Sequence, residues 1–129
     1  MSQTLKSLLA AANAVVERVD VARAQQLLRE RGAVLLDVRE PPEVAATGLA
    51  RGARAIPRGL LEFRADPAEP GHDAELRPDR PIVVYCAAGG RAALAGKLLR
   101  DMGYHEVYSL GGFKDWIEGG GEVEERAEA

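Results

Sequence analysis

The stretch between residues 81 and 102 constrains the fold of this chain more than any other part of its sequence. Residues 81–85, Pro-Ile-Val-Val-Tyr, form a short apolar run that predicts a strand buried on both faces. The glycine-containing turn 86–91 follows, and helix-forming residues then extend from Ala92 to Met102, with Gly103 as the expected C-cap. A strand, a tight turn and a helix in this order indicate a parallel sheet covered by helices.

The same alternation extends along most of the chain. Asp20 is the expected N-cap of a helix over 21–31, and Gly32 lies just past its end. The other expected elements are strands at 33–36, 53–56 and 106–109, short helices at 42–47, 60–64 and 113–118, a turn at 48–52, a surface loop at 66–80, and a break at Gly111-Gly112. We therefore expect an α/β fold of three layers, with a central parallel sheet of about five strands and helices on both faces.

Length and composition favour a single domain with short extensions. The 129 residues, 47% hydrophobic and 29% charged, suffice for one core and contain no linker or repeat. Apolar residues from Leu5 to Val19 recur at helical spacing, which favours an amphipathic N-terminal helix over a signal peptide and hence a cytoplasmic location. Residues 119–129 are expected to fray. The expected organisation is a helix at 1–18, a domain at 19–121 and an acidic tail at 122–129.

Charge and cysteine content narrow the possible functions. The net charge of −3 and the alternation of basic with acidic residues give no indication of a nucleic-acid or membrane partner. Cys86 is the single cysteine, which excludes an internal disulfide and a site with several thiolate ligands. The two histidines, His72 and His105, show no ligand spacing. We expect neither a metal nor a cofactor.

Cys86 is expected at the carboxyl end of its strand, where open parallel sheets bind ligands. The small residues after it let backbone N–H groups converge on one point, which the positive end of the next helix also faces. A thiolate or an oxyanion would be stabilised there, and Arg91 adds a cation at the mouth. The alternatives are a buried cysteine acting as a small hydrophobe, and a phosphate-binding loop, whose Lys-Ser/Thr signature is absent.

Other charged residues fall near the same edge of the sheet. Asp37 and Arg39 follow a buried strand, and we favour a supporting role, in which an ion pair or hydrogen bonds brace the Cys86 loop, over a catalytic role. Arg58 and Arg64 either line the pocket mouth, where they recruit anionic donors, or are simply solvated.

Four segments, in this order, are similar to motifs of the single-domain rhodaneses, the thiosulfate sulfurtransferase family: 35–41, Leu-Leu-Asp-Val-Arg-Glu-Pro; 53–58, with Ile56-Pro57; 84–91, with the cysteine loop; and 110–116, Leu-Gly-Gly-Phe with Trp116. Two departures are visible. The segment 47–52 lacks the usual histidine, and Ala92 stands where a serine is common. The resemblance covers about residues 19–121.

The resemblance implies that Cys86 attacks the outer sulfur of a donor such as thiosulfate, and that an acceptor such as cyanide or a thiol then removes the sulfur from a Cys86 persulfide. The implied binding residues are Ala87, Ala88, Gly89, Gly90 and Arg91, with Asp37, Arg39 and Arg58 in support. A sulfur carrier fed by a sulfur-relay protein is the alternative function, in a monomer or a homodimer. Phosphatase or arsenate reductase activity is disfavoured, because the six-residue loop Cys86–Arg91 is one residue shorter than in those relatives.

Overall fold

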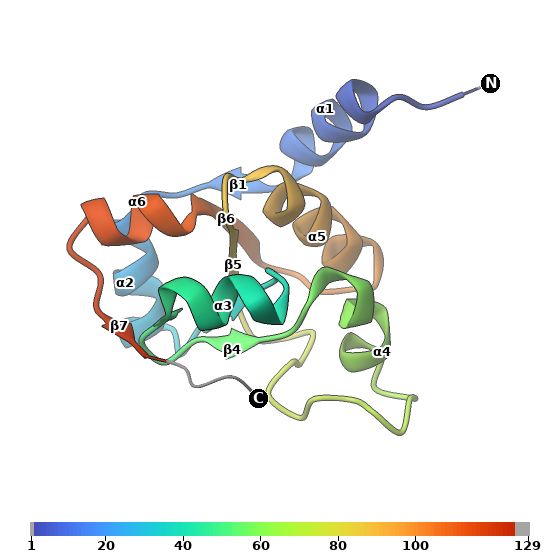
Figure 1. Ribbon diagram of the computed structural model, residues 1–129. Helices are drawn as coiled ribbons and strands as arrows, with labels where there is room; N and C mark the ends of the chain where they lie inside the picture. The colour runs from blue at the N-terminus through green and yellow to red at the C-terminus, as the bar shows by residue number, and fades with distance from the viewer. Residues whose placement is uncertain (1, 126–129) are drawn as a thin grey trace.

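The computed structural model describes residues 2–125, in which five parallel strands form the central sheet (Figure 1). Their spatial order is β1-β6-β5-β2-β4. The bounds are β1 (Glu17–Arg18), β2 (Val34–Asp37), β4 (Arg54–Ala55), β5 (Ile82–Cys86) and β6 (Val107–Gly112). Every residue of β2 and β5 is buried, because neighbouring strands cover both edges and helices cover both faces. This confirms the parallel sheet that the apolar runs predict.

Helices pack on both sides of the sheet, as expected. In Figure 1, α2 (Val21–Glu30) and α6 (Phe113–Glu118) lie to the left of β5, whereas α4 (Leu61–Ala65) and α5 (Gly90–Asp101) lie to its right. Alternate side chains of β5 divide between two cores: Val83 and Tyr85 join the α2/α6 side, and Val84 and Cys86 join the α4/α5 side. This division is the period of two expected for a strand buried on both faces.

The N-terminal helix α1 (Leu5–Val15) packs on α5 and leans away from the sheet (Figure 1). Its N-cap is Thr4, and of its residues only Ala12 is fully buried, whereas Leu5 and Leu8 are exposed. A helix is present as predicted, but its apolar stripe contributes little to the core. The strand β1 that follows was not predicted, because two exposed residues carry no alternating pattern.

The predicted helix signals around α2 are confirmed. The carboxylate of Asp20 accepts a hydrogen bond from the backbone nitrogen of Arg23, and Gly32 takes a positive φ of 64° just past the helix end. The next helix, α3 (Pro41–Thr47), begins with two prolines at the positions where an amide would have no partner. A 3₁₀ turn, η1 (Arg58–Leu60), leads into α4.

Two sequence expectations about the chain's path are wrong. The segment 48–52 is not only a turn: β3 (Leu49–Ala50) pairs antiparallel with β7 (Val123–Glu124). The predicted fraying is therefore wrong for residues 119–125, which include the paired strand β7. Residues 126–129 lie outside the described part of the chain. The indole N–H of Trp116 donates to the carbonyl of Glu122 and so fixes the segment that leads into β7. These strands could not be predicted, because two residues are too few to show the alternation of side chains by which a strand is recognised in a sequence.

The predicted break at Gly111-Gly112 is also wrong. Strand β6 continues to Gly112, with an irregularity in its register against β5 after Val84. Gly111 has a φ of 99°, which lets the strand shift register without ending. The two glycines therefore extend the sheet beside Cys86 rather than terminate it.

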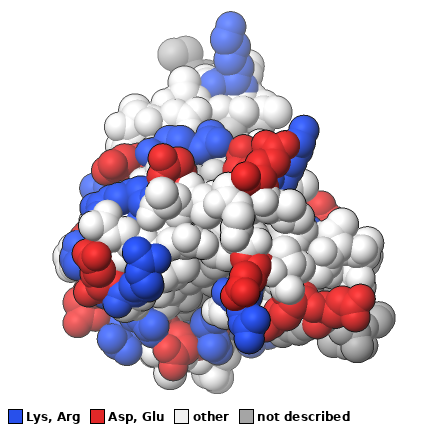
Figure 2. Space-filling model, turned by 90° about the vertical axis from the view of Figure 1, so that its left-hand side faces the viewer, with Lys and Arg blue, Asp and Glu red and all other residues white. Residues whose placement is uncertain are grey.

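The loop 66–80 contains no helix or strand, as predicted. It is nevertheless anchored, because Leu76 is fully buried and its carbonyl accepts a hydrogen bond from the hydroxyl of Tyr104. Acidic and basic side chains are intermixed on the face that carries α2 and α6 (Figure 2). None of the described helices is both long and apolar enough to cross a membrane.

Candidate active site

The sulfur of Cys86 sits at the carboxyl end of β5, where it accepts hydrogen bonds from two backbone amides. Its Sγ lies 2.9 Å from the nitrogen of Gly89 and 3.3 Å from that of Ala92. Cys86 itself is 1% exposed, while the following Ala87 and Ala88 are exposed. Gly89 is the N-cap of α5 and supplies no side-chain acceptor, so the sulfur takes the place that a capping oxygen usually fills. Two N–H donors and a helix N-terminus stabilise negative charge on this atom.

The loop takes its shape from glycines on two segments. Gly89 has a φ of 118°, a conformation that residues with a side chain rarely adopt. Gly112, at the end of the neighbouring strand β6, lies so close to Ala87 that a β-carbon on Gly112 would overlap the Ala87 carbonyl oxygen. Sequence reasoning read Gly112 as a break and missed this contact. The available signal was a glycine pair at the end of a strand next to the cysteine strand.

Arg91, predicted to bind the donor, forms a bidentate ion pair with Glu43 of α3. Arg91 Nη1 lies 2.7 Å from Oε1 of Glu43, and Arg91 Nη2 lies 2.9 Å from Oε2. The backbone nitrogen of Glu40 also donates to Oε1 of Glu43 at 2.9 Å. The hydrogen bonds from Arg91 lower the pKa of Glu43 from 4.5 to about 2, and the same bonds raise the pKa of Arg91. Glu43 is the second residue that sequence reasoning missed; its signal was an acid in the first turn of a helix after a strand's carboxyl end.

Asp37 and Arg39 form a buried ion pair, one of the two supporting arrangements that the sequence leaves open. Arg39 Nη2 lies 2.8 Å from Oδ2 of Asp37 and also donates to the carbonyl of Gly48 at 2.7 Å. Its guanidinium carbon lies 4.2 Å from the ring centroid of Phe113. Burial alone lowers the pKa of Arg39, but the hydrogen bonds and charge of Asp37 outweigh burial, so that the pKa is raised.

This pair braces the neighbourhood of the site rather than the cysteine loop itself. The ring of Tyr85, the residue before Cys86, lies 5.7 Å from the Arg39 guanidinium carbon and stacks on Phe113 at 5.9 Å. The hydroxyl of Tyr85 accepts a hydrogen bond from the nitrogen of Ala50. Burial raises the pKa of Tyr85, and the charge of Asp37 raises it further. The pair therefore fixes Tyr85, and through it the end of β5.

The remaining predicted residues take different positions. Arg58 lies beside the carboxyl end of β2, where its backbone nitrogen donates to the carbonyl of Val38. Its guanidinium pairs with Glu62 at 3.1 Å. Arg64 is exposed on α4. Residues 2–125 contain no group of three His, Cys, Asp or Glu side chains placed to hold a metal ion.

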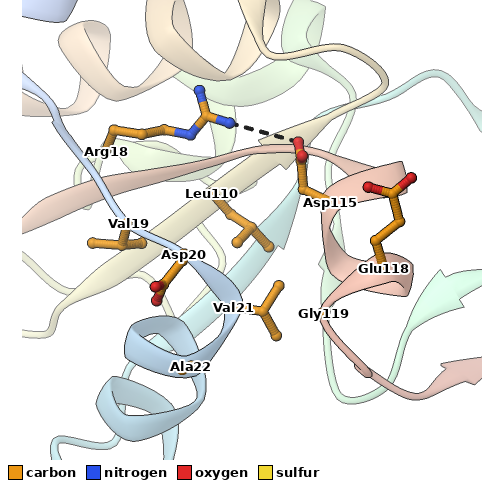
Figure 3. Close-up of a pocket in the computed structure, with 9 residues that line it drawn as sticks. All are labelled: Arg18, Val19, Asp20, Val21, Ala22, Leu110, Asp115, Glu118 and Gly119. Atoms are coloured by element: carbon orange, nitrogen blue, oxygen red, sulfur yellow. Dashed lines mark ion pairs between the residues drawn. The ribbon is translucent and has the colours of Figure 1, made fainter.

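A separate groove of about 620 Å³ lies on the α2/α6 side (Figure 3). Its apolar floor includes Val19, Val21 and Leu110. On one wall Arg18 pairs with Asp115 at 3.6 Å, and Oδ2 of Asp115 accepts a hydrogen bond from the nitrogen of Gly112. Asp115 thus links a wall of the groove to the end of β6 at Gly112, which lies against the cysteine loop.

The chain matches one protein family over most of its length. The profile of the Rhodanese-like domain family matches residues 20–118. Thiosulfate sulfurtransferase GlpE of Pseudomonas syringae is 34% identical over 92 residues, which cover 70% of this chain and 78% of GlpE. A sulfurtransferase of Allochromatium vinosum is 32% identical over 108 residues, covering 82% of this chain and 92% of that protein. The uncharacterized protein YqhL of Bacillus subtilis is 41% identical over 87 residues, which make up 67% of this chain. The match spans only 62% of the length of YqhL.

Solved structures show the same likeness. A Rhodopseudomonas palustris protein of unknown function, described as a possible tyrosine phosphatase, superposes with a TM-score of 0.85 at 35% identity, covering 96% of both chains. The polysulfide-sulfur transferase homodimer of Wolinella succinogenes gives a TM-score of 0.74 at 35% identity, covering 94% of this chain and 87% of that one. Both superpositions cover more than nine-tenths of this chain.

Proposed function

The chain belongs to the rhodanese-like family of sulfurtransferases, and on that premise we propose that it transfers sulfane sulfur from thiosulfate or a similar donor to a thiophilic acceptor. The observation that carries the proposal is the position of Cys86 Sγ, which accepts two amide N–H bonds at the start of α5. A thiolate held in this way is a nucleophile whose charge the backbone stabilises both before and after it takes up sulfur.

The proposed reaction is a double displacement. The Cys86 thiolate attacks the outer sulfur of thiosulfate, a new S–S bond forms, and the old S–S bond breaks as sulfite leaves with its electron pair. The negative charge now rests on the outer sulfur of the Cys86 persulfide. An acceptor such as cyanide or a cellular thiolate then attacks that outer sulfur, and the Cys86 thiolate is regenerated.

Two features support sulfur chemistry over phosphoryl chemistry. The loop Cys86–Arg91 has six residues, a cradle suited to a sulfur atom rather than a tetrahedral phosphate. A phosphatase also needs its loop arginine for the phosphoryl oxygens, whereas here both terminal nitrogens of Arg91 are bound to Glu43. We therefore do not assign to this chain the phosphatase activity suggested for its Rhodopseudomonas palustris relative.

Formation of thiocyanate from thiosulfate and cyanide tests the proposal. Wild-type protein is expected to turn over, and Cys86→Ser to be inactive. Mass spectrometry of protein treated with thiosulfate is expected to show one added sulfur on Cys86. Turnover that survives Cys86→Ser would rule out the persulfide mechanism. Persulfide loading from a cysteine desulfurase without thiosulfate turnover would instead identify a carrier that serves a sulfur-relay protein.

The proposed setting follows from the chemistry. A single free thiol that must cycle through a thiolate persists in a reducing compartment, and we place the protein in the cytoplasm. The proposed partners are the small-molecule donor and acceptor, and no cofactor takes part in the two displacement steps. Both a monomer and a homodimer, the state of the Wolinella succinogenes relative, are compatible with a site built from one chain.

A further inference from the structure

The arginines around Cys86 are already neutralised by carboxylates of the same chain. Arg39 is bound to Asp37 inside the core, Arg58 to Glu62, and Arg91 to Glu43. Of these, only Arg91 belongs to the cysteine loop, and a negative charge on Cys86 is among the causes that raise the pKa of Arg91, after its bonds to Glu43. The loop cation that could attract an anionic donor therefore already has a counter-charge, because both terminal nitrogens of Arg91 are bound to Glu43.

Glu43 is held rigidly in that position. It is the third residue of α3, where it accepts the backbone N–H of Glu40 and the two Nη atoms of Arg91 together. Pro41 and Pro42 fix the start of the helix that carries it. The charge of Glu40 also acts on Arg91. Two carboxylates thus oppose one guanidinium beside the loop, and a donor cannot form the same bidentate pair with Arg91 without displacing Glu43.

The charge of the donor decides how strongly Glu43 opposes its binding. Thiosulfate brings two negative charges, whereas the Glu43–Arg91 pair has no net charge and residues 87–90 of the loop add only neutral backbone amides. A hydropersulfide, R–S–SH, is neutral or carries one charge, and it delivers the same sulfane sulfur. Repulsion by Glu43 therefore acts on a dianionic donor more strongly than on a hydropersulfide.

We propose that Glu43 is a specificity-determining residue, which occupies Arg91 and so favours neutral or singly charged sulfane donors over dianionic ones at Cys86. The inference rests on the proposed sulfurtransferase function. In the favoured reaction the Cys86 thiolate attacks the outer sulfur of R–S–SH. The Cys86–sulfur bond forms, the S–S bond of the donor breaks, and RS⁻ leaves with the electron pair, while the proton stays on the transferred sulfur.

The test compares two donors, thiosulfate and 2-hydroxyethyl hydropersulfide, whose organic part carries no charge, in wild-type protein and in Glu43→Gln. The substitution removes the charge but leaves an amide oxygen that can still accept from Arg91. We expect KM for thiosulfate to fall about three- to tenfold and KM for the hydropersulfide to change less than twofold. Glu75→Gln is the matched control, because Glu75 pairs with Arg80 beside the amino end of β5, at the opposite end from Cys86. It is expected to change neither KM.

A second variant keeps the inference testable if Glu43→Gln folds poorly. Arg91→Met leaves Glu43 charged without its partner, and it is expected to raise KM for thiosulfate more than KM for the hydropersulfide. Equal shifts for both donors, or no shift in either variant, would overturn the role of Glu43. Absence of a Cys86 persulfide with either donor in wild-type protein would instead overturn the sulfurtransferase function itself.

Discussion

Gly112 lies against Ala87 with no room for a side chain: a β-carbon on Gly112 would overlap the Ala87 carbonyl oxygen and lie 3.2 Å from the Cα of Ala88. The end of β6 therefore acts as a wall for the first half of the cysteine loop. The backbone amide of Gly89, which donates to the sulfur of Cys86, is positioned by Ala87 and Ala88.

Gly112→Ala is expected to displace the loop and lower sulfurtransferase activity about 100-fold, because a shift of the order of an ångström misaligns the reacting groups. It is also expected to destabilise the fold by about 1–3 kcal/mol through overpacking. Thiocyanate formation and urea unfolding measure the two effects. Gly59→Ala is the control, since a β-carbon there meets no neighbouring atom. Normal activity in Gly112→Ala would show that the loop does not depend on this contact.

Asp37→Asn is expected to destabilise the protein by about 3–5 kcal/mol, because it leaves the guanidinium of Arg39 buried without a counter-charge. Denaturant unfolding monitored by the fluorescence of Trp116 checks this value. Asp79→Asn, in an exposed pair with Arg77, is the matched substitution and is expected to change stability by less than about 0.5 kcal/mol. Equal effects of the two substitutions would contradict a structural role for the buried pair.

Tyr85→Phe removes the hydroxyl that accepts the backbone N–H of Ala50, which is fully buried. The expected cost is about 1–3 kcal/mol, the price of leaving a buried donor unsatisfied. Tyr108→Phe serves as the comparison, because its hydroxyl donates to the carboxylate of Glu106, which is only half-buried, so that water can replace the hydroxyl. Amide hydrogen exchange at Ala50 should accelerate in Tyr85→Phe alone. Unchanged exchange there would show that another group takes over the acceptor role.

The ion pair between Glu43 and Arg91 predicts a specific acid dependence. The pKa of Glu43 is depressed in the folded state, from 4.5 to about 2, so its contribution to stability is complete above pH 4.5 and is lost as the pH falls towards 2. Thermal unfolding of wild-type protein and Glu43→Gln should differ by a constant amount above about pH 5, and the curves should converge between pH 4.5 and 2. Both side chains are more than one-third exposed, so added salt should reduce the difference. A difference independent of pH would exclude this assignment.

The sequence predicts the fold well where side-chain periodicity is strong. Buried runs such as 82–85 and helix signals such as Asp20 and Gly32 appear in the structure where expected. The short strands β1, β3 and β7 were missed, because backbone bonds between distant segments hold them and two residues define no period. The placement of Cys86 at a strand end followed from local sequence alone.

The contacts around the site could not be predicted in the same way. The pairing of Glu43 with Arg91 joins two helices that are far apart in sequence, and its geometry depends on how α3 crosses the carboxyl end of the sheet. The role of Gly112 likewise depends on the register of β6 against β5. Both are tertiary relationships, which no local pattern in the sequence encodes.

The sulfur of Cys86 takes part in the first turn of α5 as well as in chemistry, since it accepts from Gly89 and Ala92. A bulky alkylating reagent that captures this atom also withdraws the acceptor from the helix start. Such reagents are therefore expected to change the conformation as well as the activity. The modified protein should unfold at a lower temperature, and its amide hydrogen exchange should accelerate first at residues 89–92. Covalent occupancy of the thiol can thus be followed from the backbone, without any assay of sulfur transfer.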